Sequence, residues 1–274
     1  METLMRARLL RRTGHGVALT PAGAEFHSFA QETLASFERT QQRIIETEGA
    51  TPDQLTLSVP LRLGRLLIPV LHRKFASALP DMTLHVHEEA SDRAPELMQS
   101  GQIDAMITYA PCPSPDSRGV PLASESLYAV GTKDLLGTAS IPIRLSEIGQ
   151  MELLTPHKGN YRKLLKSSLS AHGIHMKIAR ELETAEGLLA FAAEGDGVAI
   201  LPMSNVYQEY ERGEVMVRPI VSPEIERILV LYPSPTMNRH TLDVVLPIVR
   251  GSISKVATLA DWKTVRKNGG VAKI

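Results

Sequence analysis

Four arginines lie within the first twelve residues of the chain: Arg6, Arg8, Arg11 and Arg12. They stand in or just before the stretch LLRRTGHGVALTPAG (residues 9–23), in which two short apolar runs flank a turn with Gly14, His15 and Gly16. Apolar runs around such a turn predict a two-stranded β-hairpin. Cationic side chains on a hairpin can contact DNA phosphates or a minor groove, which positions a protein but conveys little sequence information. The four arginines therefore form a local basic patch at which nucleic acid could be contacted.

A second set of polar residues follows the ends of predicted strands. Arg62 comes after the strand predicted over residues 55–59, and a further group follows the strand predicted over residues 151–156: His157, Lys158, Asn160 and Arg162. In open α/β folds, ligands bind outside the carboxyl ends of strands, where helix N-termini favour anions. These residues therefore favour a small carboxylate or a similar anion as the ligand. Surface ion pairs at Arg62 and Arg162 are the alternative interpretation.

Signatures of enzymes and metal sites are missing from the sequence. His85 and His87 lie two residues apart on one predicted strand, but no third ligand is in view, so we expect no metal. The single cysteine, Cys112, has no base beside it and excludes an intramolecular disulfide. There is no GxSxG elbow and no P-loop, and the GDGVA stretch lacks the third glycine of a dinucleotide fingerprint. We expect neither an enzyme nor a cofactor.

The composition is that of an ordinary globular protein. The chain has 274 residues, 43% of them hydrophobic and 22% charged, with a formal net charge of zero. Contact with nucleic acid must therefore come from local patches. No apolar run reaches the roughly 18 residues needed to cross a bilayer, and no signal peptide is recognisable, which predicts a cytoplasmic location without membrane contact.

The elements that position these residues alternate between strands and helices. Strands are predicted over residues 55–59, 82–88, 103–109, 125–131, 151–156, 175–183, 197–202, 215–223 and 226–233. Helices are predicted between them over residues 65–79, 91–101, 160–173 and 184–195, and a last helix over residues 242–256. This order predicts α/β units with a largely parallel sheet.

One long helix is predicted before the α/β units, from Pro21 to about Glu48, with Thr20 as its cap. Its apolar residues recur at three- and four-residue steps and form one stripe. A stripe of this length needs a partner, so we expect a dimer contact of the coiled-coil type, with packing on the chain's own domain as the alternative. The residues expected at the contact are Phe26, Phe29, Leu34, Phe37, Ile44 and Ile45.

In four stretches and their spacing, the sequence resembles the LysR-type transcriptional regulators. The stretches are LLRRTGHGVALTPAG, LIPVLHRKFASALPDMTLHV, LMQSGQIDAMIT and LLAFAAEGDGVAILP. The resemblance implies an α/β fold: a two-lobed effector domain like a periplasmic binding protein of type 2, preceded by the wing of a winged helix-turn-helix and a linker helix. It implies a wing at residues 1–20, a linker helix at 21–50 and an effector domain at 55–274. Lobe I would comprise residues 55–108 and 220–256 and lobe II residues 109–219, joined by crossing strands at Ile107–Ala110 and Val217–Val221. In the wing, Arg11, Arg12 and His15 would face DNA phosphates or a minor groove.

The resemblance also implies a small-molecule effector in the cleft between the lobes, and a homodimer or homotetramer. The residues expected to contact the effector are Leu61, Arg62, Leu63, Thr108, Tyr109, Thr155, Pro156, Asn160, Arg162, Thr184 and Val198. In the family, a Ser or Thr in the loop after the first strand often bonds the effector. Here that loop is Leu61-Arg62-Leu63, so the sequence departs from the family at this contact.

Members of the family have about sixty residues before the linker helix, whereas twenty precede it here. The expectation is therefore a truncated helix-turn-helix and weak, non-specific DNA binding by these 274 residues, because base readout needs an element that enters the major groove. A ligand-binding or dimerisation module without specific DNA binding is the alternative function.

Overall fold

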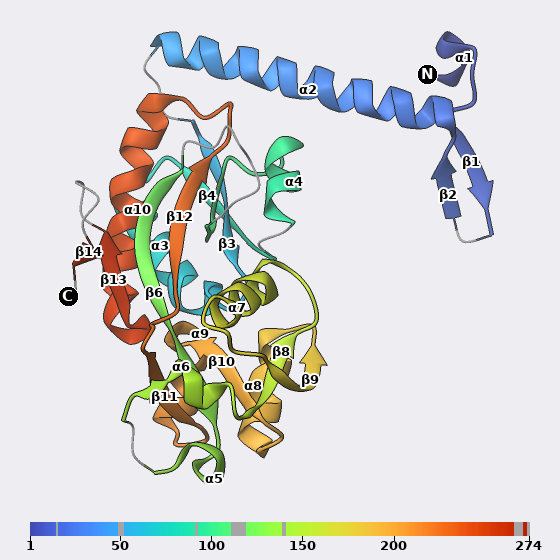
Figure 1. Ribbon diagram of the computed structural model, residues 1–274. Coiled ribbons are helices and arrows are strands. Elements are labelled where there is room, and N and C mark those ends of the chain that lie inside the picture. Colours follow the sequence, from blue (N-terminus) through green and yellow to red (C-terminus); the bar gives the residue numbers. More distant parts are fainter. Residues whose placement is uncertain are drawn as a thin grey trace.

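The structure, a computed structural model, describes residues 1–14, 16–48, 52–90, 93–110, 119–138, 141–265 and 271–272 (Figure 1). His15 and Cys112, both considered above, lie outside the described residues. At the N-terminus stand α1 (Glu2–Met5), β1 (Leu10–Thr13), β2 (Gly16–Leu19) and α2 (Pro21–Glu48). With 28 residues, α2 is about 42 Å long at 1.5 Å per residue.

The N-terminal hairpin packs closely against the start of α2. β1 and β2 pair antiparallel, with Leu10 opposite Leu19. The Thr20 hydroxyl accepts a hydrogen bond from the Gly23 amide at 3.0 Å, so the predicted cap is confirmed. A Cβ atom at Gly23 would lie 1.9 Å from the carbonyl oxygen of Leu9, so only glycine lets the helix approach the hairpin this closely.

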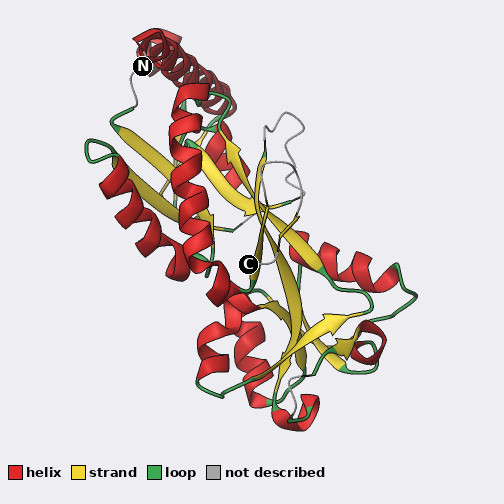
Figure 2. Cartoon of the chain, turned by 90° about the vertical axis from the view of Figure 1, so that its left-hand side faces the viewer, coloured by secondary structure: helices red, strands yellow, loops and turns green. Residues whose placement is uncertain are grey.

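The first lobe is a mixed sheet with helices on both faces (Figure 2). Its strands are β3 (Gln54–Pro60), β4 (Thr83–Glu89), β5 (Ala105–Tyr109), β12 (Glu226–Pro233), β13 (Trp262–Val265) and β14 (Val271–Ala272). Its helices are α3 (Gly64–Ala78), α4 (Ala94–Gln99) and α10 (Arg239–Ala260). Apolar side chains of α3 and α10 form the core on one face, and those of α4 pack on the other.

The second lobe has its own sheet and two apolar cores, one on each face. Its strands are β7 (Ile143–Arg144), β8 (Glu152–Pro156), β9 (Lys177–Leu182), β10 (Val198–Pro202) and β11 (Met216–Val221). Its helices are α5 (Lys133–Leu136), α6 (Leu145–Ile148), α7 (Asn160–Ser170), α8 (Ala185–Glu194) and α9 (Met203–Glu211). The sequence did not predict α9, of which only Ser204 and Val206 are buried, so its apolar signal is weak.

The two lobes share one continuous strand, β6 (Val120–Gly131). Its first half pairs with β12 in the first lobe, and residues from Leu127 onward pair with β10 in the second. The predicted crossing at Ile107–Ala110 is therefore wrong, because β5 pairs with β3 and β12 within the first lobe. Val217–Val221 does not cross either, since β11 pairs with β6 and β7 in the second lobe and the chain returns through residues 222–225.

Two further expectations need correction. The lobe boundaries fall near residue 126 and at residues 222–225, not at 108/109 and 219/220. The prediction failed because the apolar periodicity of a strand does not reveal its pairing partners. The sheet is mixed: β3, β4 and β5 run parallel, as do β8, β9 and β10, whereas β6 and β12 pair antiparallel with their neighbours. Among the described residues, no helix is long and apolar enough to cross a membrane.

Candidate functional site

A cavity of about 360 Å³ lies between the two lobes. Its first-lobe lining comes from the β3–α3 loop, the start of α3 and the end of β4: Leu61, Arg62, Arg65 and Glu88. Its second-lobe lining comes from the β9–α8 junction: Glu183, Thr184, Ala185 and Glu186. The cavity therefore collects three of the predicted effector-contact residues, namely Leu61, Arg62 and Thr184.

The β3–α3 loop directs Arg62 toward the second lobe. Leu63 is buried in the first-lobe core, which anchors the loop, whereas Leu61 is exposed. Arg62 itself has a φ of 69°, in the left-handed region that non-glycine residues rarely adopt. Backbone strain of this kind persists only where the surroundings enforce it, and it gathers at functional sites.

The second-lobe side of the cavity is the N-terminus of α8. Thr184 caps this helix, because its hydroxyl accepts a hydrogen bond from the Gly187 amide at 3.0 Å. Gly195 ends the helix in the left-handed conformation, so both predicted boundaries are confirmed. Glu186 then falls in the first turn of α8, beside the cavity.

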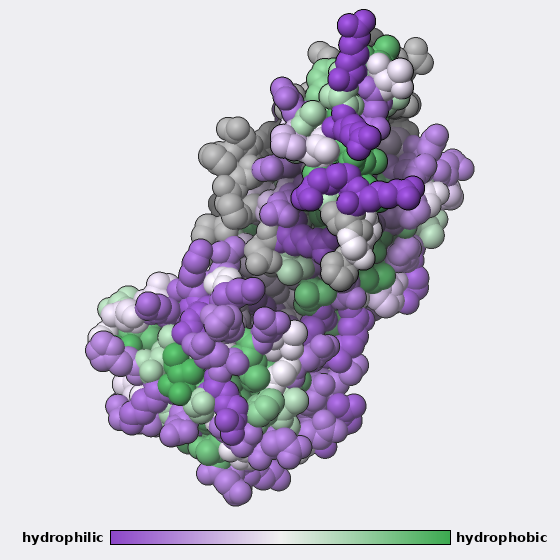
Figure 3. Space-filling model, turned by 90° about the vertical axis from the view of Figure 1, so that its right-hand side faces the viewer, coloured by the Kyte–Doolittle hydropathy of each residue, from purple (hydrophilic) through white to green (hydrophobic). Residues whose placement is uncertain are grey.

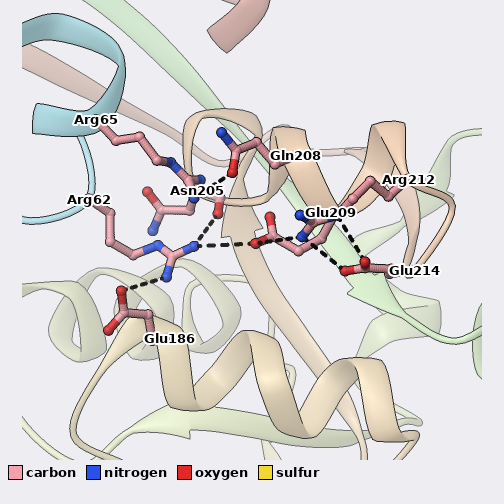
Figure 4. A network of polar contacts seen from close by, with 8 residues as sticks. All are labelled: Arg62, Arg65, Glu186, Asn205, Gln208, Glu209, Arg212 and Glu214. Atoms are coloured by element: carbon pink, nitrogen blue, oxygen red, sulfur yellow. Dashed lines mark hydrogen bonds and ion pairs between the residues drawn. The ribbon is translucent and has the colours of Figure 1, made fainter. Parts of the chain in front are cut away.

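Arg62 connects the lobes through three partners (Figure 4). Nη1 lies 3.0 Å from Glu186 Oε1, and Nη2 donates to the carbonyl oxygen of Asn205 at 2.8 Å. Nη2 also lies 4.0 Å from Glu209 Oε1 on α9. The Arg62 side chain is only 11% exposed, so these contacts replace most of its solvent.

Neighbouring side chains extend this polar network along α9. Arg65 donates to the side-chain oxygen of Gln208 at 2.9 Å. Arg212 lies 3.7 Å from Glu209 and 2.8 Å from Glu214 (Figure 4). Arg62 thus joins a set of charges on the second lobe and, being largely buried, forms an interlobe ion pair at the cavity and not the surface ion pair of the alternative interpretation.

A second interlobe cluster lies where β6 crosses between the sheets; we call Glu125, Arg227, Trp262 and Ser204 the crossing-strand cluster. The buried carboxylate of Glu125 accepts hydrogen bonds from Arg227 Nε at 2.7 Å and Trp262 Nε1 at 2.8 Å, and another from the Ser204 hydroxyl. Arg227 and Trp262 are the residues opposite Glu125 on the two flanking strands, and Ser204 comes from α9. The Glu125 carboxylate therefore connects β6 to β12, β13 and α9.

Two tyrosines flank the guanidinium of Arg227. Its Cζ atom lies 3.6 Å from the centre of the Tyr109 ring and 5.1 Å from that of Tyr161. Burial raises the pKa of both phenols above the ordinary value. Burial alone would lower the pKa of Arg227, but the neighbouring Glu125 carboxylate raises it, so Arg227 stays charged. The predicted contact residue Tyr109 thus lies on this cluster and not in the lining of the cavity.

Three predicted site residues form a separate cluster at the end of β8. Arg162 donates to the Thr155 hydroxyl at 2.9 Å and to the Pro156 carbonyl oxygen at 2.7 Å. It also lies 2.6 Å from Glu181, whose pKa is lowered by a hydrogen bond with His157 and by the Arg162 charge. Arg162 therefore has its ion-pair partner within the second lobe.

The remaining predicted contact residues lie elsewhere. Leu63 and Val198 are buried in the cores of the first and second lobes. Thr108 is buried in β5, and Asn160 is the exposed first residue of α7. Thr155, Pro156 and Arg162 are likewise absent from the lining of the 360 Å³ cavity.

A further cavity of about 340 Å³ lies between β6, β11 and the end of α10, and no predicted site residue lines it. Its polar groups are paired: Lys263 bonds Glu224 at 3.0 Å and also Glu226, and the Tyr128 hydroxyl bonds Asp261. The hydrogen bond from Lys263 lowers the pKa of Glu226. Across the described residues, no group of three potential metal ligands is found, and His85 and His87 belong to none.

Sequence reasoning missed Glu186 at the cavity and Glu209 near Arg62 on α9. It also missed Glu125 and Arg227 at the crossing. Glutamates on helix surfaces are too common to stand out. Glu125 and Arg227 had a usable signal, because each is a charged residue within an apolar strand run, ESLYAVG or ERILVLYP. A charge in such a run is paired when buried.

The N-terminal elements carry the predicted DNA and dimer residues. Arg11 and Arg12 are exposed on β1. Strongly hydrophilic side chains project from the upper part of the face in Figure 3, where the N-terminal elements lie. On α2, Phe29, Leu34 and Phe37 are 59%, 62% and 67% exposed, and the Phe26 and Phe29 rings lie 6.4 Å apart. The side chains of Ile44 and Ile45 lie outside the described ones.

A family model for the LysR substrate binding domain matches residues 48–246. Among curated proteins, the chain is 26% identical to the nitrogen assimilation regulatory protein nac of Klebsiella aerogenes over 206 residues, which are 74% of this chain and 67% of that protein. It is 20% identical over 264 residues to the HTH-type transcriptional regulator BbuR of Bordetella bronchiseptica, covering 96% of this chain and 81% of that one.

Solved structures share the fold over almost the whole chain. A full-length OxyR variant from Pseudomonas aeruginosa superposes with a TM-score of 0.72 at 21% identity, covering 95% of this chain and 84% of that one. Full-length CbnR in complex with its target DNA superposes with a TM-score of 0.67 at 21% identity, covering 92% and 86%.

Proposed function

Since the chain belongs to the LysR family of transcriptional regulators, we propose that it binds a small anionic effector in the 360 Å³ cavity and thereby regulates transcription from DNA. The observation that carries this proposal is Arg62, a cation in the cavity wall that belongs to one lobe and contacts the other. An anion bound there would contact residues of both lobes. Its different affinity for two lobe arrangements is what drives a switch.

A thermal-shift screen with succinate, malate and citrate tests the effector class, with succinamide as the neutral control. A ligand at a hundredfold excess over its Kd stabilises the protein by about 2.7 kcal/mol. We expect stabilisation by at least one acid, its loss in Arg62→Ala, and its retention in Arg73→Ala, which removes an exposed arginine of α3 away from the cavity. An acid that stabilises wild type and Arg62→Ala equally would place the site elsewhere.

For DNA, the proposal assigns phosphate contacts to the exposed Arg11 and Arg12 of the hairpin. Such contacts add affinity without discriminating between sequences. Each phosphate neutralised contributes about −0.9 to the slope of log K against log salt. In a titration of a random duplex, Arg11→Ala with Arg12→Ala should therefore flatten the slope by about 1.8 per chain. An unchanged slope would remove the hairpin from the interface.

For assembly, the proposal assigns a dimer contact to the exposed apolar residues of α2, among them Phe29 and Phe37. Exposed aromatic side chains along one helix lose water contact when a second copy covers them. Phe29→Glu with Phe37→Glu should raise the monomer fraction in sedimentation velocity at micromolar concentration. A wild-type protein that sediments as a monomer there would contradict this assignment.

A further inference from the structure

We infer that Glu186 is an internal competitor of the effector: its carboxylate holds the position on Arg62 that an effector's carboxylate takes, and binding displaces it. This inference rests on the proposed function, because it describes how the same cavity is regulated. The displaced residue belongs to the second lobe, so binding also exchanges a contact between the lobes for a contact with the ligand.

Glu186 can leave its position easily. Its Oε1 atom lies 3.0 Å from Arg62 Nη1, yet its side chain is 73% exposed, whereas that of Arg62 is 11% exposed. The carboxylate of Glu186 is therefore largely hydrated, and turning it into solvent sacrifices little beyond the ion pair. Pairs with an exposed partner contribute little to stability, typically equivalent to a factor of about five or less in an equilibrium constant.

Arg62 stays in position when Glu186 leaves, because the other end of the guanidinium is held independently. Nη2 donates to the carbonyl oxygen of Asn205 at 2.8 Å, a backbone acceptor that cannot swing away. Glu209, only 16% exposed, lies 4.0 Å from the same nitrogen and is steadied by Arg212 at 3.7 Å. The two carboxylates near Arg62 thus differ: Glu209 is a fixed neighbour, and Glu186 is exchangeable (Figure 4).

The vacated position suits an incoming carboxylate. The guanidinium of Arg62 stays charged, and Nη1 keeps its N–H donors. A hydrogen bond from a charged donor to a carboxylate is stronger than a hydrogen bond between two neutral groups. Thr184 and Ala185, at the N-terminus of the ten-residue α8, line the same cavity, and the dipole of that helix also favours an anion there.

Site-resolved NMR titration tests the exchange. Succinate is titrated into wild type, Glu186→Gln and Glu183→Gln while the Nε–Hε signal of Arg62 is followed; Arg62→Lys assigns that signal. Glu183 is a matched control, because it lines the same cavity with the same charge but is not among the ion-pair partners of Arg62. We expect Glu186→Gln to lower the Kd of succinate up to about fivefold, and Glu183→Gln to lower it by clearly less.

Three results would overturn the exchange, and they are distinguishable. If Glu186→Gln leaves the Kd of succinate unchanged, Arg62 still binds the anion, but Glu186 does not compete with it. Equal gains in both glutamine variants show that only the total charge of the cavity matters. If succinate moves the Arg62 signal in none of the three proteins while thermal unfolding shows them folded, the anion site itself fails, and with it the proposed effector class.

Discussion

Arg62 and Arg227 both lie where the two lobes meet and both pair with a carboxylate, yet Arg62 pairs across the lobes with Glu186, whereas Arg227 pairs with Glu125 within the first lobe. The side chain of Glu186, which pairs with Arg62, is 73% exposed, whereas that of Glu125, which pairs with Arg227, is 1% exposed. Arg62 reaches across a cavity, and Arg227 lies on β12, beside the part of β6 that precedes its entry into the second lobe. The comparison separates two kinds of contact: the Glu186 carboxylate at the cavity is largely hydrated, whereas the buried contacts of Glu125 hold β6, β12 and β13 together and receive Ser204 from the second lobe.

The difference follows from solvation. A carboxylate that faces water loses little when its partner leaves, because water replaces the partner. A carboxylate taken out of water needs its partners, since an uncompensated buried charge is costly. Glu125 has an arginine, an indole and a hydroxyl as donors, so its burial is fully compensated.

The largest expected effect comes from breaking the crossing-strand cluster. Glu125→Gln removes the charge but keeps the shape and leaves Arg227 buried without a counter-charge. We expect a loss of about 3–5 kcal/mol in the free energy of unfolding, measured by urea denaturation. Adding Arg227→Met to that variant should recover part of the loss, because both charges are then absent. A loss below about 1 kcal/mol for Glu125→Gln would show that the cluster tolerates an unpaired arginine.

A smaller effect is expected at the cavity. Arg62→Ala removes the hydrogen bond to Asn205 and both ion pairs, which should lower the free energy of unfolding by about 1–2 kcal/mol. Amide hydrogen exchange should increase in α8 and α9, because each loses its contact with Arg62. Arg65→Ala is the control, since Arg65 makes one exposed hydrogen bond, to Gln208, and should cost no more than about 0.5 kcal/mol. Equal losses in the two variants would place Arg62 among ordinary surface residues.

The smallest expected effect comes from raising the salt concentration, which should affect the exposed Arg62–Glu186 pair more than the buried Arg227–Glu125 pair. Raising the ionic strength from about 0.1 to 1 M shortens the Debye length from about 10 to 3 Å and weakens exposed pairs far more than buried ones. Amide exchange in the first turn of α8 should accelerate up to about fivefold. The Trp262 indole N–H, which donates to Glu125, should exchange at an unchanged rate. Glu186→Gln should abolish the salt response of α8, and a response that persists would have another origin.

The sequence predicted the fold better than the connections within it. Strand and helix positions, the Thr20 and Thr184 caps and the Gly195 stop followed from local patterns that the structure confirms. The crossing strand did not, because residues 105–109 and 120–131 are both apolar runs, and only pairing partners reveal which of them reaches the second lobe.

At the candidate site, the sequence predicted which loops meet at the cavity, but not the ion pairs that form there. Leu61, Arg62 and Thr184 follow or precede strands and helices in the sequence, so their convergence could be expected. The Glu125–Arg227 pair depends on strand register across 102 positions, and Glu186 depends on how the lobes face each other. Neither relation is encoded in local spacing.

The pairing of Ser126 with Glu226 makes the whole second lobe an insertion into a β-hairpin. The two chain ends at which the lobe leaves and returns are cross-strand neighbours, so a two-residue Asn-Gly turn could join them in its place. Such a deletion would keep Arg227 and Trp262 on Glu125 and remove only Ser204 from that carboxylate. The segment that forms the second lobe is therefore continuous in the chain, and it leaves and re-enters the first lobe at one pair of neighbouring residues.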